Sequence, residues 1–192
     1  DRNNFVQISP TEMPEISPAA RAVRYWDLAA TPVSETNTNP DWTVGTLGIF
    51  DQGVFYVLDV KKIRAKGEDV ERLIRKTAEE DGKLVAIRME MEPGSSGKNL
   101  VDQYARYVLA GFDFEGLRVT GDKTTRARPF ASAAANGNVR VLQAPWMNDW
   151  LDEFSAFPEA CDHDDQVDSA VGAFTFLAGL GQPRRGKLNI IV

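Results

Sequence analysis

The sequence is poor in cysteine and histidine, with one residue of each among its 192 (Cys161 and His163). A single cysteine excludes a disulfide within the chain and any zinc site built on cysteines. No stretch reaches the uninterrupted apolar length of a membrane span, and the N-terminus lacks the pattern of a signal peptide. We therefore expect a soluble protein of a reducing compartment.

Internal repeats and low-complexity tracts are also absent, and the composition is that of an ordinary globular protein, 43% hydrophobic and 26% charged. A chain of this length can bury a substantial core. Residues 1–20 hold three prolines and little periodicity, which predicts an extended lead-in or linker. We expect residues 21–192 to form a single domain.

The net charge of −6 argues against a nucleic-acid partner, but the charge is unevenly distributed. Acidic residues crowd positions 149–168, whereas Lys123, Arg126 and Arg128 stand in a stretch with few acids, and a second basic group follows at 184–187. An acidic site flanked by basic loops suits a metal-dependent phosphodiester enzyme. A solvated mixed surface is the simpler alternative on charge alone.

The order of the predicted elements indicates an α/β fold. Strands are expected at 22–29, 42–50, 54–63, 83–91, 117–119 and 139–142, and helices at 68–80, around 100–109, at 131–135, at 146–154 and from about 164. Asp51-Gln52-Gly53 marks a hairpin, while polar loops are expected at 31–40 and 122–130. Antiparallel strands followed by helical crossovers predict a mixed central sheet flanked by helices.

The strongest chemical signal is an acidic cluster at the start of the last predicted helix. Asp164, Asp165 and Asp168 directly precede the apolar run 170–178. Capping and the helix dipole explain acids at a helix start, but three carboxylates are more than a cap needs. Hard divalent cations take carboxylate and water oxygens, so the cluster predicts a metal site.

Two other groups of acids follow predicted strands. Asp27 ends the strand 22–29, and Glu90 and Glu92 end the strand 83–91. If these strands are neighbours and the last helix packs across them, the acids converge on a two-metal site for in-line phosphoryl displacement. Each acid also has a simpler explanation: Asp27 as a turn residue, Glu90 or Glu92 as an edge charge, and the helix acids as a cap and a surface ion pair.

Several motifs together resemble the C-terminal nuclease domain of the large terminase subunits of tailed phages. The resemblance covers nearly the whole chain from about residue 20, and the His-Asp-Asp-Gln-Val-Asp run is its most specific part. Its segments are 24–29 (RYWDLA), 41–43 (DWT), 89–98 (MEMEPGSSGK), 122–129 (DKTTRARP), 157–158 (FP) and 163–169 (HDDQVDS).

The resemblance implies a ribonuclease H-like fold, shared with RuvC resolvases and retroviral-type integrases. It also implies an endonuclease that cuts concatemeric double-stranded viral DNA in the host cytoplasm during packaging, with two Mg²⁺ or Mn²⁺ ions. The portal and the small terminase subunit would be its partners in the full large terminase.

Matched by position, Asp27 is the ligand expected to bridge both metals. The second carboxylate is Glu90, with Glu92 as the alternate. The third is Asp165, with Asp164 close behind and Asp168 as outer support.

Other residues are assigned less directly. Lys98, Lys123, Arg126 and Arg128 are candidates for DNA phosphate contacts, with a solvated loop as the alternative for the last three. His163 is a candidate general base or outer ligand, although a structural hydrogen bond to a carboxylate is the simpler interpretation.

A full large terminase also carries an N-terminal ATPase with a Walker motif. The stretch 94–99 (GSSGKN) imitates the end of a phosphate loop. However, it lacks the first glycine and has Asn99 where Ser or Thr should ligate magnesium, so we predict no nucleotide site there. Two other functions stay open: a resolvase or transposase-type nuclease on the same fold, and a non-catalytic DNA- or partner-binding domain.

Overall fold

The computed structural model describes residues 1–29 and 39–179. Most of the predicted polar loop 31–40 and the basic group 184–187 lie outside the described residues. The strands are β1 (Val6–Ile8), β2 (Arg21–Asp27), β3 (Thr43–Asp51), β4 (Val54–Ile63), β5 (Ala86–Met91), β6 (Phe114–Arg118) and β7 (Val139–Leu142). The helices are α1 (Gly67–Asp81), α2 (Ser95–Gln103) with a π-helical extension Tyr104–Val108, α3 (Lys123–Ala135), α4 (Met147–Ala156) and α5 (Asp165–Ala178); two short 3₁₀ helices are Arg2–Asn4 and Pro10–Glu12.

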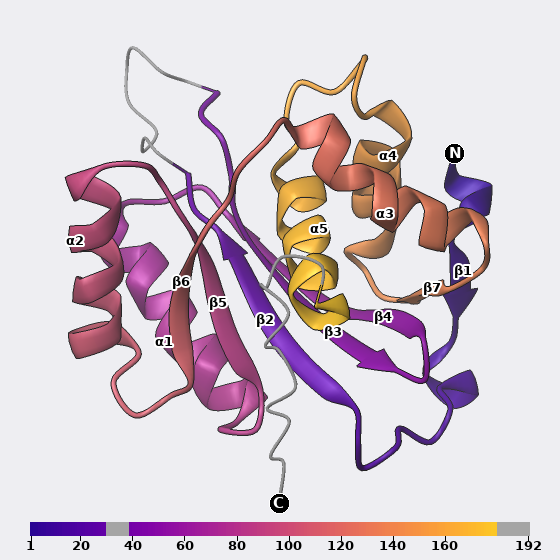
Figure 1. Ribbon diagram of the computed structural model, residues 1–192, viewed down its shortest axis with the longest axis horizontal. Coiled ribbons are helices and arrows are strands. Elements are labelled where there is room, and N and C mark those ends of the chain that lie inside the picture. The colour runs from indigo at the N-terminus through magenta and orange to yellow at the C-terminus, as the bar shows by residue number, and fades with distance from the viewer. Residues whose placement is uncertain (30–38, 180–192) are drawn as a thin grey trace, which may run out of the picture.

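The seven strands form one mixed sheet in the order β1-β7-β4-β3-β2-β5-β6. Strands β2, β3 and β4 are antiparallel neighbours, as the hairpin at 51–53 predicted. Strands β5 and β6 extend the sheet in parallel from β2, and β7 and β1 extend it in parallel from β4. The predicted mixed sheet flanked by helices is therefore confirmed, and β2 and β5 lie side by side in it (Figure 1).

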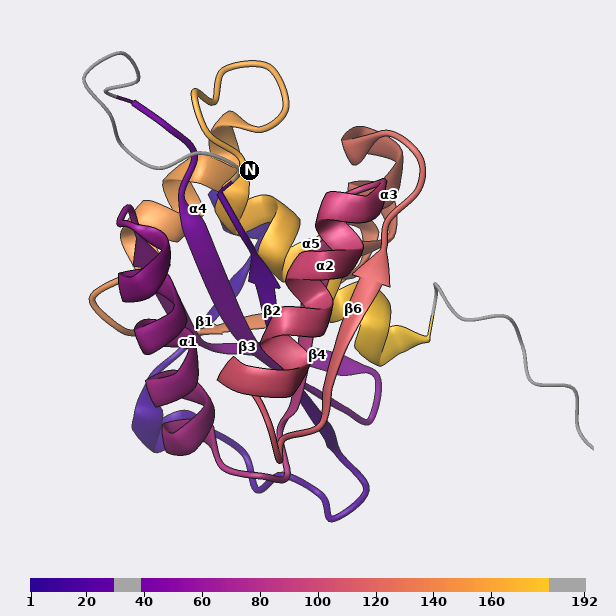
Figure 2. The ribbon, with the colours of Figure 1, turned by 90° about the vertical axis from the view of Figure 1, so that its left-hand side faces the viewer.

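Helices cover both faces of the sheet, each over its own apolar core. Helices α3, α4 and α5 pack on one face, where Tyr25 of β2 is buried, and α1 and α2 pack on the other, where Trp26 is buried (Figures 1 and 2). The opposite faces of Tyr25 and Trp26 follow from the two-residue period of a strand. Side chains at Arg24 and Trp26 thus face α1, and those at Tyr25 and Asp27 face α5.

Helix α5 lies unusually close to β2, and Gly172 permits this approach. A Cβ atom at Gly172 would lie 2.3 Å from the Tyr25 ring, so a larger residue would push the helix away. One turn earlier, the Ser169 hydroxyl donates to the Tyr25 carbonyl (2.8 Å) and accepts from the Thr46 amide (3.0 Å). These contacts fix the first turn of α5 against the middle of the sheet.

Two predicted segments take a different form in the structure. The expected lead-in 1–20 contributes β1, which pairs with β7 at the sheet edge, and Phe5, which packs against Trp150. The expected loop 122–130 was wrong, because α3 begins at Lys123 and runs through Pro129. Asp122 caps this helix by accepting from the Thr125 amide (2.8 Å), and Pro129 lies within it.

Within residues 1–29 and 39–179, no helix has both the length and the apolar character that crossing a membrane requires.

Candidate metal centre

Asp27 and Glu90 lie at the C-terminal ends of the neighbouring parallel strands β2 and β5, and so at the same end of the sheet. Trp26 of β2 pairs with Met89 of β5, so the next residue on each strand is one of these acids. Trp26 and Met89 face α1, and therefore Asp27 and Glu90 both face α5. The Thr43 hydroxyl accepts from the Ala29 amide (3.1 Å) and ties the chain down just after Asp27.

The first turn of α5 brings further acids to this edge. Asp165 and Asp168 are both buried, with 5% and 7% of their surface exposed. Residues Asp165 and Asp168 lie three apart and so share one face of the helix. Acids from two strands and one helix thus converge, as the sequence pattern led us to expect.

Burial and mutual repulsion make these carboxylates hard to ionise. Burial raises the pKa of Asp27 well above its ordinary value of 3.8, and the negative charges of Asp168, Glu90 and Asp165 raise it further. Burial also raises the pKa of Glu90, of Asp165 and of Asp168. Among these charges, that of Asp168 contributes most to the raised pKa of Asp27.

Two cations of α3 lie among the acids. Lys123 Nζ contacts Asp164 (2.7 Å) and Asp168 (2.6 Å). Arg126 spans Glu90 (3.5 Å) and Asp168 (3.3 Å). Burial alone would lower the pKa of Lys123, but its hydrogen bonds to Asp164 and Asp168 raise it. Both residues were predicted to contact DNA, and the structure brings them to the carboxylates themselves.

Asp165 faces a different set of neighbours from Asp168. Its carboxylate accepts from the Trp42 amide (3.0 Å), and His163 Nδ1 lies 3.8 Å from it and 3.4 Å from Asp41. Asp41, His163 and Asp165 can each offer a ligand atom within 4.8 Å of the others, a spacing that suits a metal ion.

The protonation of His163 decides how it acts in that group. Arg64 lies 2.7 Å from His163 Nε2 and can only donate, so Nε2 accepts. In the neutral ring the proton then lies on Nδ1 and faces the two carboxylates. This Nδ1 makes no hydrogen bond to either carboxylate, and in this tautomer it does not offer a lone pair to a metal ion, so Asp41 and Asp165 are the two members of the group that supply ligand oxygens.

The remaining predicted site residues lie further out. Glu92 is exposed at the rim of the cleft described below, past the end of β5. Lys98 and Arg128 are exposed on α2 and α3. Asp164 is the residue before α5 and pairs with Lys123.

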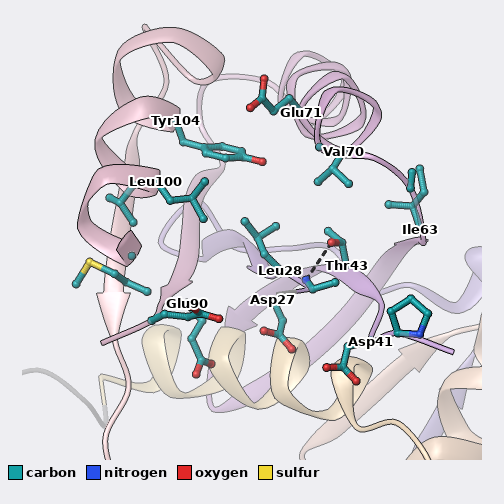
Figure 3. Close-up of a pocket in the computed structure, with 18 of the residues that line it drawn as sticks. Asp27, Leu28, Asp41, Thr43, Ile63, Val70, Glu71, Glu90, Leu100 and Tyr104 are labelled. Carbon is teal, nitrogen blue, oxygen red and sulfur yellow. Dashed lines mark hydrogen bonds between the residues drawn. The ribbon is translucent and has the colours of Figure 1, made fainter. Parts of the chain in front are cut away.

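A cleft of about 390 Å³ opens beside the acids, between the sheet edge and helices α1 and α2 (Figure 3). Asp27 and Glu90 lie at one end of the cleft, near α5, while Tyr104 and Glu71 lie at the opposite end. The carboxylates are therefore accessible to a ligand although they are largely buried.

Sequence reasoning missed two residues that support the site. Glu153 of α4 accepts from the Gln166 and Val167 amides at the start of α5 (2.6 and 3.1 Å), and Arg64 fixes His163. Arg64 and His163 lie 99 residues apart, and Glu153 acts from the preceding helix, so no local pattern marks either residue. Burial raises the pKa of Glu153, although its hydrogen bonds oppose this effect.

Comparison with known proteins gives a consistent match. The family model described as "Terminase RNaseH-like domain" matches residues 24–175, a span that holds all the acids of the site. No curated protein matches the chain.

Several solved structures share the fold. The P22 large terminase nuclease domain has 14% identity and a TM-score of 0.62, over 93% of this chain and 89% of that one. The large terminase nuclease from thermophilic phage G20c with bound magnesium has 16% identity and a TM-score of 0.60, over 91% and 94%. The nuclease domain from bacteriophage SPP1 with bound Mn has 13% identity and a TM-score of 0.57, over 90% and 96%. At these identities the likeness establishes the fold.

Proposed function

Because the chain belongs to the family of terminase RNaseH-like domains, we propose that it is the metal-dependent endonuclease domain of a phage large terminase. In this role it hydrolyses phosphodiester bonds of concatemeric double-stranded viral DNA during genome packaging. The full large terminase would work in the host cytoplasm with the portal and the small terminase subunit.

The convergence of Asp27, Glu90, Asp165 and Asp168 is the observation that carries this proposal. Four buried or half-buried carboxylates face one another, and the pKa of each is raised. Such a group is costly to keep ionised unless cations lie between its oxygens. Hard oxygen donors suit Mg²⁺ and Mn²⁺, and the G20c and SPP1 relatives were solved with these two metals.

Each acid of the site has its own role in this proposal. Asp27 would be the carboxylate shared by the two ions. Glu90 and Asp168 would be the further direct ligands, Asp165 would support the site from the side of Trp42, and Glu92 and Asp164 lie further from the centre. When bound, the two ions supply an activated water and a stabilised leaving oxygen.

The choice between Asp165 and Asp168 stays a prediction. Arg126 contacts both Glu90 (3.5 Å) and Asp168 (3.3 Å), which places Asp168 next to the second strand acid and supports Asp168 as a direct ligand. Asp165 instead accepts from the Trp42 amide and lies on the side of His163. Lys123 and Arg126 would then turn from the acids to the DNA phosphates once the ions neutralise the carboxylates.

Cleavage of supercoiled plasmid tests the proposal. The chain should nick and linearise plasmid in Mn²⁺ or Mg²⁺ and leave it intact in EDTA. Asp27→Asn should slow cleavage by about a hundredfold or more. Glu79→Gln, an exposed acid on α1, is the matched control and should cut like the wild type.

Two results would contradict the proposal. Plasmid left intact by the wild type in Mn²⁺ would exclude endonuclease activity of this domain. Cutting confined to four-way junctions would instead support a resolvase.

A further inference from the structure

The cleft beside the acids has a lining that the hydrolysis of a phosphodiester does not by itself require. Beyond Asp27 and Glu90 it is walled by apolar side chains from the strand ends and from both helices: Leu28, Ile63, Val70, Leu100, Val101 and Tyr104. Val70 and Tyr104 are buried, so this part of the wall is held by the core (Figure 3). The volume of about 390 Å³ lies within the range of small-molecule sites.

The charge of the cleft excludes a phosphate beyond the metal centre. Five carboxylates line it, against the single guanidinium of Arg64; the acids are Asp27, Asp41, Glu71, Glu90 and Glu92. A phosphate is therefore favoured only at the end where metal ions would neutralise Asp27 and Glu90. The group that enters the apolar part should be uncharged.

We propose that this cleft receives a nucleobase turned out of the duplex, from a nucleotide next to the cleaved phosphate. The proposal rests on the proposed nuclease function, because it assumes a DNA strand at the acids. A base is flat, uncharged and linked to the phosphate by a short sugar, so it can reach the cleft while the phosphate stays at the metals. Apolar and aromatic side chains bind an unstacked base through its face without reading its sequence.

The far end of the cleft offers a hydrogen-bond acceptor to the edge of a base. The Glu71 carboxylate lies there near Tyr104, and the Gln103 side-chain amide donates to it (2.8 Å) (Figure 3). An ionised carboxylate only accepts hydrogen bonds. Every base carries an N–H group that can donate to Glu71: the amino groups of cytosine, adenine and guanine, and the N3–H of thymine. The contact should therefore hold a base by its edge without selecting among bases.

Filling the cleft tests the site. Leu100 is 39% exposed, so Leu100→Trp should fold and occupy the space between α2 and the acids. The control is Leu84→Trp, which adds the same side chain at a position 98% exposed, before the opposite end of β5.

Leu100→Trp should slow plasmid cleavage at least tenfold and leave the Mn²⁺ affinity, measured by calorimetry, unchanged. Leu84→Trp should cleave plasmid at the wild-type rate. The fluorescence of 2-aminopurine placed along a short duplex should rise on binding to the wild type in Ca²⁺, and should not rise with Leu100→Trp. Equal cleavage and equal fluorescence for the two variants would overturn the proposal.

The outcomes separate the base site from the nuclease. A wild type that cuts plasmid but shows no rise in 2-aminopurine fluorescence at any position flanking the cut contradicts the base site and keeps the nuclease. A wild type that does not cut at all contradicts the proposed function instead.

Discussion

The Glu153 carboxylate holds Gln166 by two hydrogen bonds, accepting from its backbone amide (2.6 Å) and from its side-chain amide (2.7 Å). Glu153 thus takes the place of a capping side chain at the start of α5, although it belongs to α4. Asp164, the residue before the helix, makes no capping hydrogen bond and contacts Lys123 instead. The carboxylates of this turn are therefore not used for capping and remain available to the metal site.

Glu153→Ala should destabilise the protein and weaken the metal centre. It leaves the buried amides of Gln166 and Val167 without their acceptor, which costs about 1–3 kcal/mol. Urea denaturation measures this loss, and Mn²⁺ calorimetry should show weaker binding because the first turn of α5 loosens. Glu153→Gln keeps an acceptor oxygen and should recover most of both properties. Glu159→Ala, at an exposed position, is the control and should change neither. A Mn²⁺ affinity unchanged in Glu153→Ala would contradict the positioning role.

The stability of the metal-free protein should fall as the pH rises from about 4 toward neutrality. The pKa values of Asp27, Glu90, Asp165 and Asp168 are all raised above their ordinary values of 3.8 and 4.5. A carboxyl group whose pKa is higher in the folded protein holds more protons there. Its contribution to stability is therefore fully present below the pKa of the group in the unfolded chain, and it is lost as the pH rises through the pKa of the group in the folded protein. Thermal melts in EDTA between pH 4.5 and 8 measure this slope.

Metal should reverse the effect, since cations favour the ionised carboxylates. Mn²⁺ should raise Tm more at pH 8 than at pH 5. The double variant Asp27→Asn, Glu90→Gln removes two of the raised groups and should flatten the slope in EDTA. A double variant that keeps the full wild-type slope would assign the pH dependence to other residues.

The strand acids could be predicted from the sequence, and the reason is geometric. An acid at the C-terminal end of a buried strand lies at that end of the sheet, and Asp27, the last residue of β2, and Glu90, the next-to-last residue of β5, both have this position. Their pairing required only that β2 and β5 be neighbours. The family resemblance and the order of elements both indicated this arrangement.

The ranking of the acids on α5 could not be predicted in the same way. Asp165 and Asp168 lie on one face of the helix, so only the packing of α5 decides which faces Asp27. That packing depends on Ser169 and Gly172, whose partner Tyr25 is distant in the sequence, and on Glu153 of the preceding helix. The sequence-based preference for Asp165 rested on position within the motif.

Substitutions of Asp168 and of Asp165 should therefore slow cleavage by different amounts. Asp168→Asn should slow plasmid cleavage by about a hundredfold or more, as the loss of a direct ligand does. Asp165→Asn should cost about tenfold, the effect of an outer group that orients a site. Cleavage rates and Mn²⁺ affinities of the two variants measure the difference. The reverse order would favour Asp165 as the ligand, and Glu92→Gln, an exposed acid beside Glu90, should stay near the wild-type rate.

The glycine at the start of α2 holds that helix against the end of β5. A Cβ atom at Gly97 would clash with the carbonyl oxygen of Glu92, in the backbone that directly follows β5 and its acid Glu90. Gly97→Ala should therefore destabilise the protein by about 1–3 kcal/mol, the cost of overpacking. It should also reduce plasmid cleavage.

Gly67 at the start of α1 has nothing within 4 Å of an added Cβ. Gly67→Ala should leave stability unchanged or raise it by about 0.4–1 kcal/mol, because alanine restricts the unfolded chain more than glycine does. Urea denaturation should thus show a lower free energy of unfolding for Gly97→Ala and an unchanged or higher one for Gly67→Ala. Equal effects would mean that the contact between α2 and Glu92 does not constrain the sheet edge.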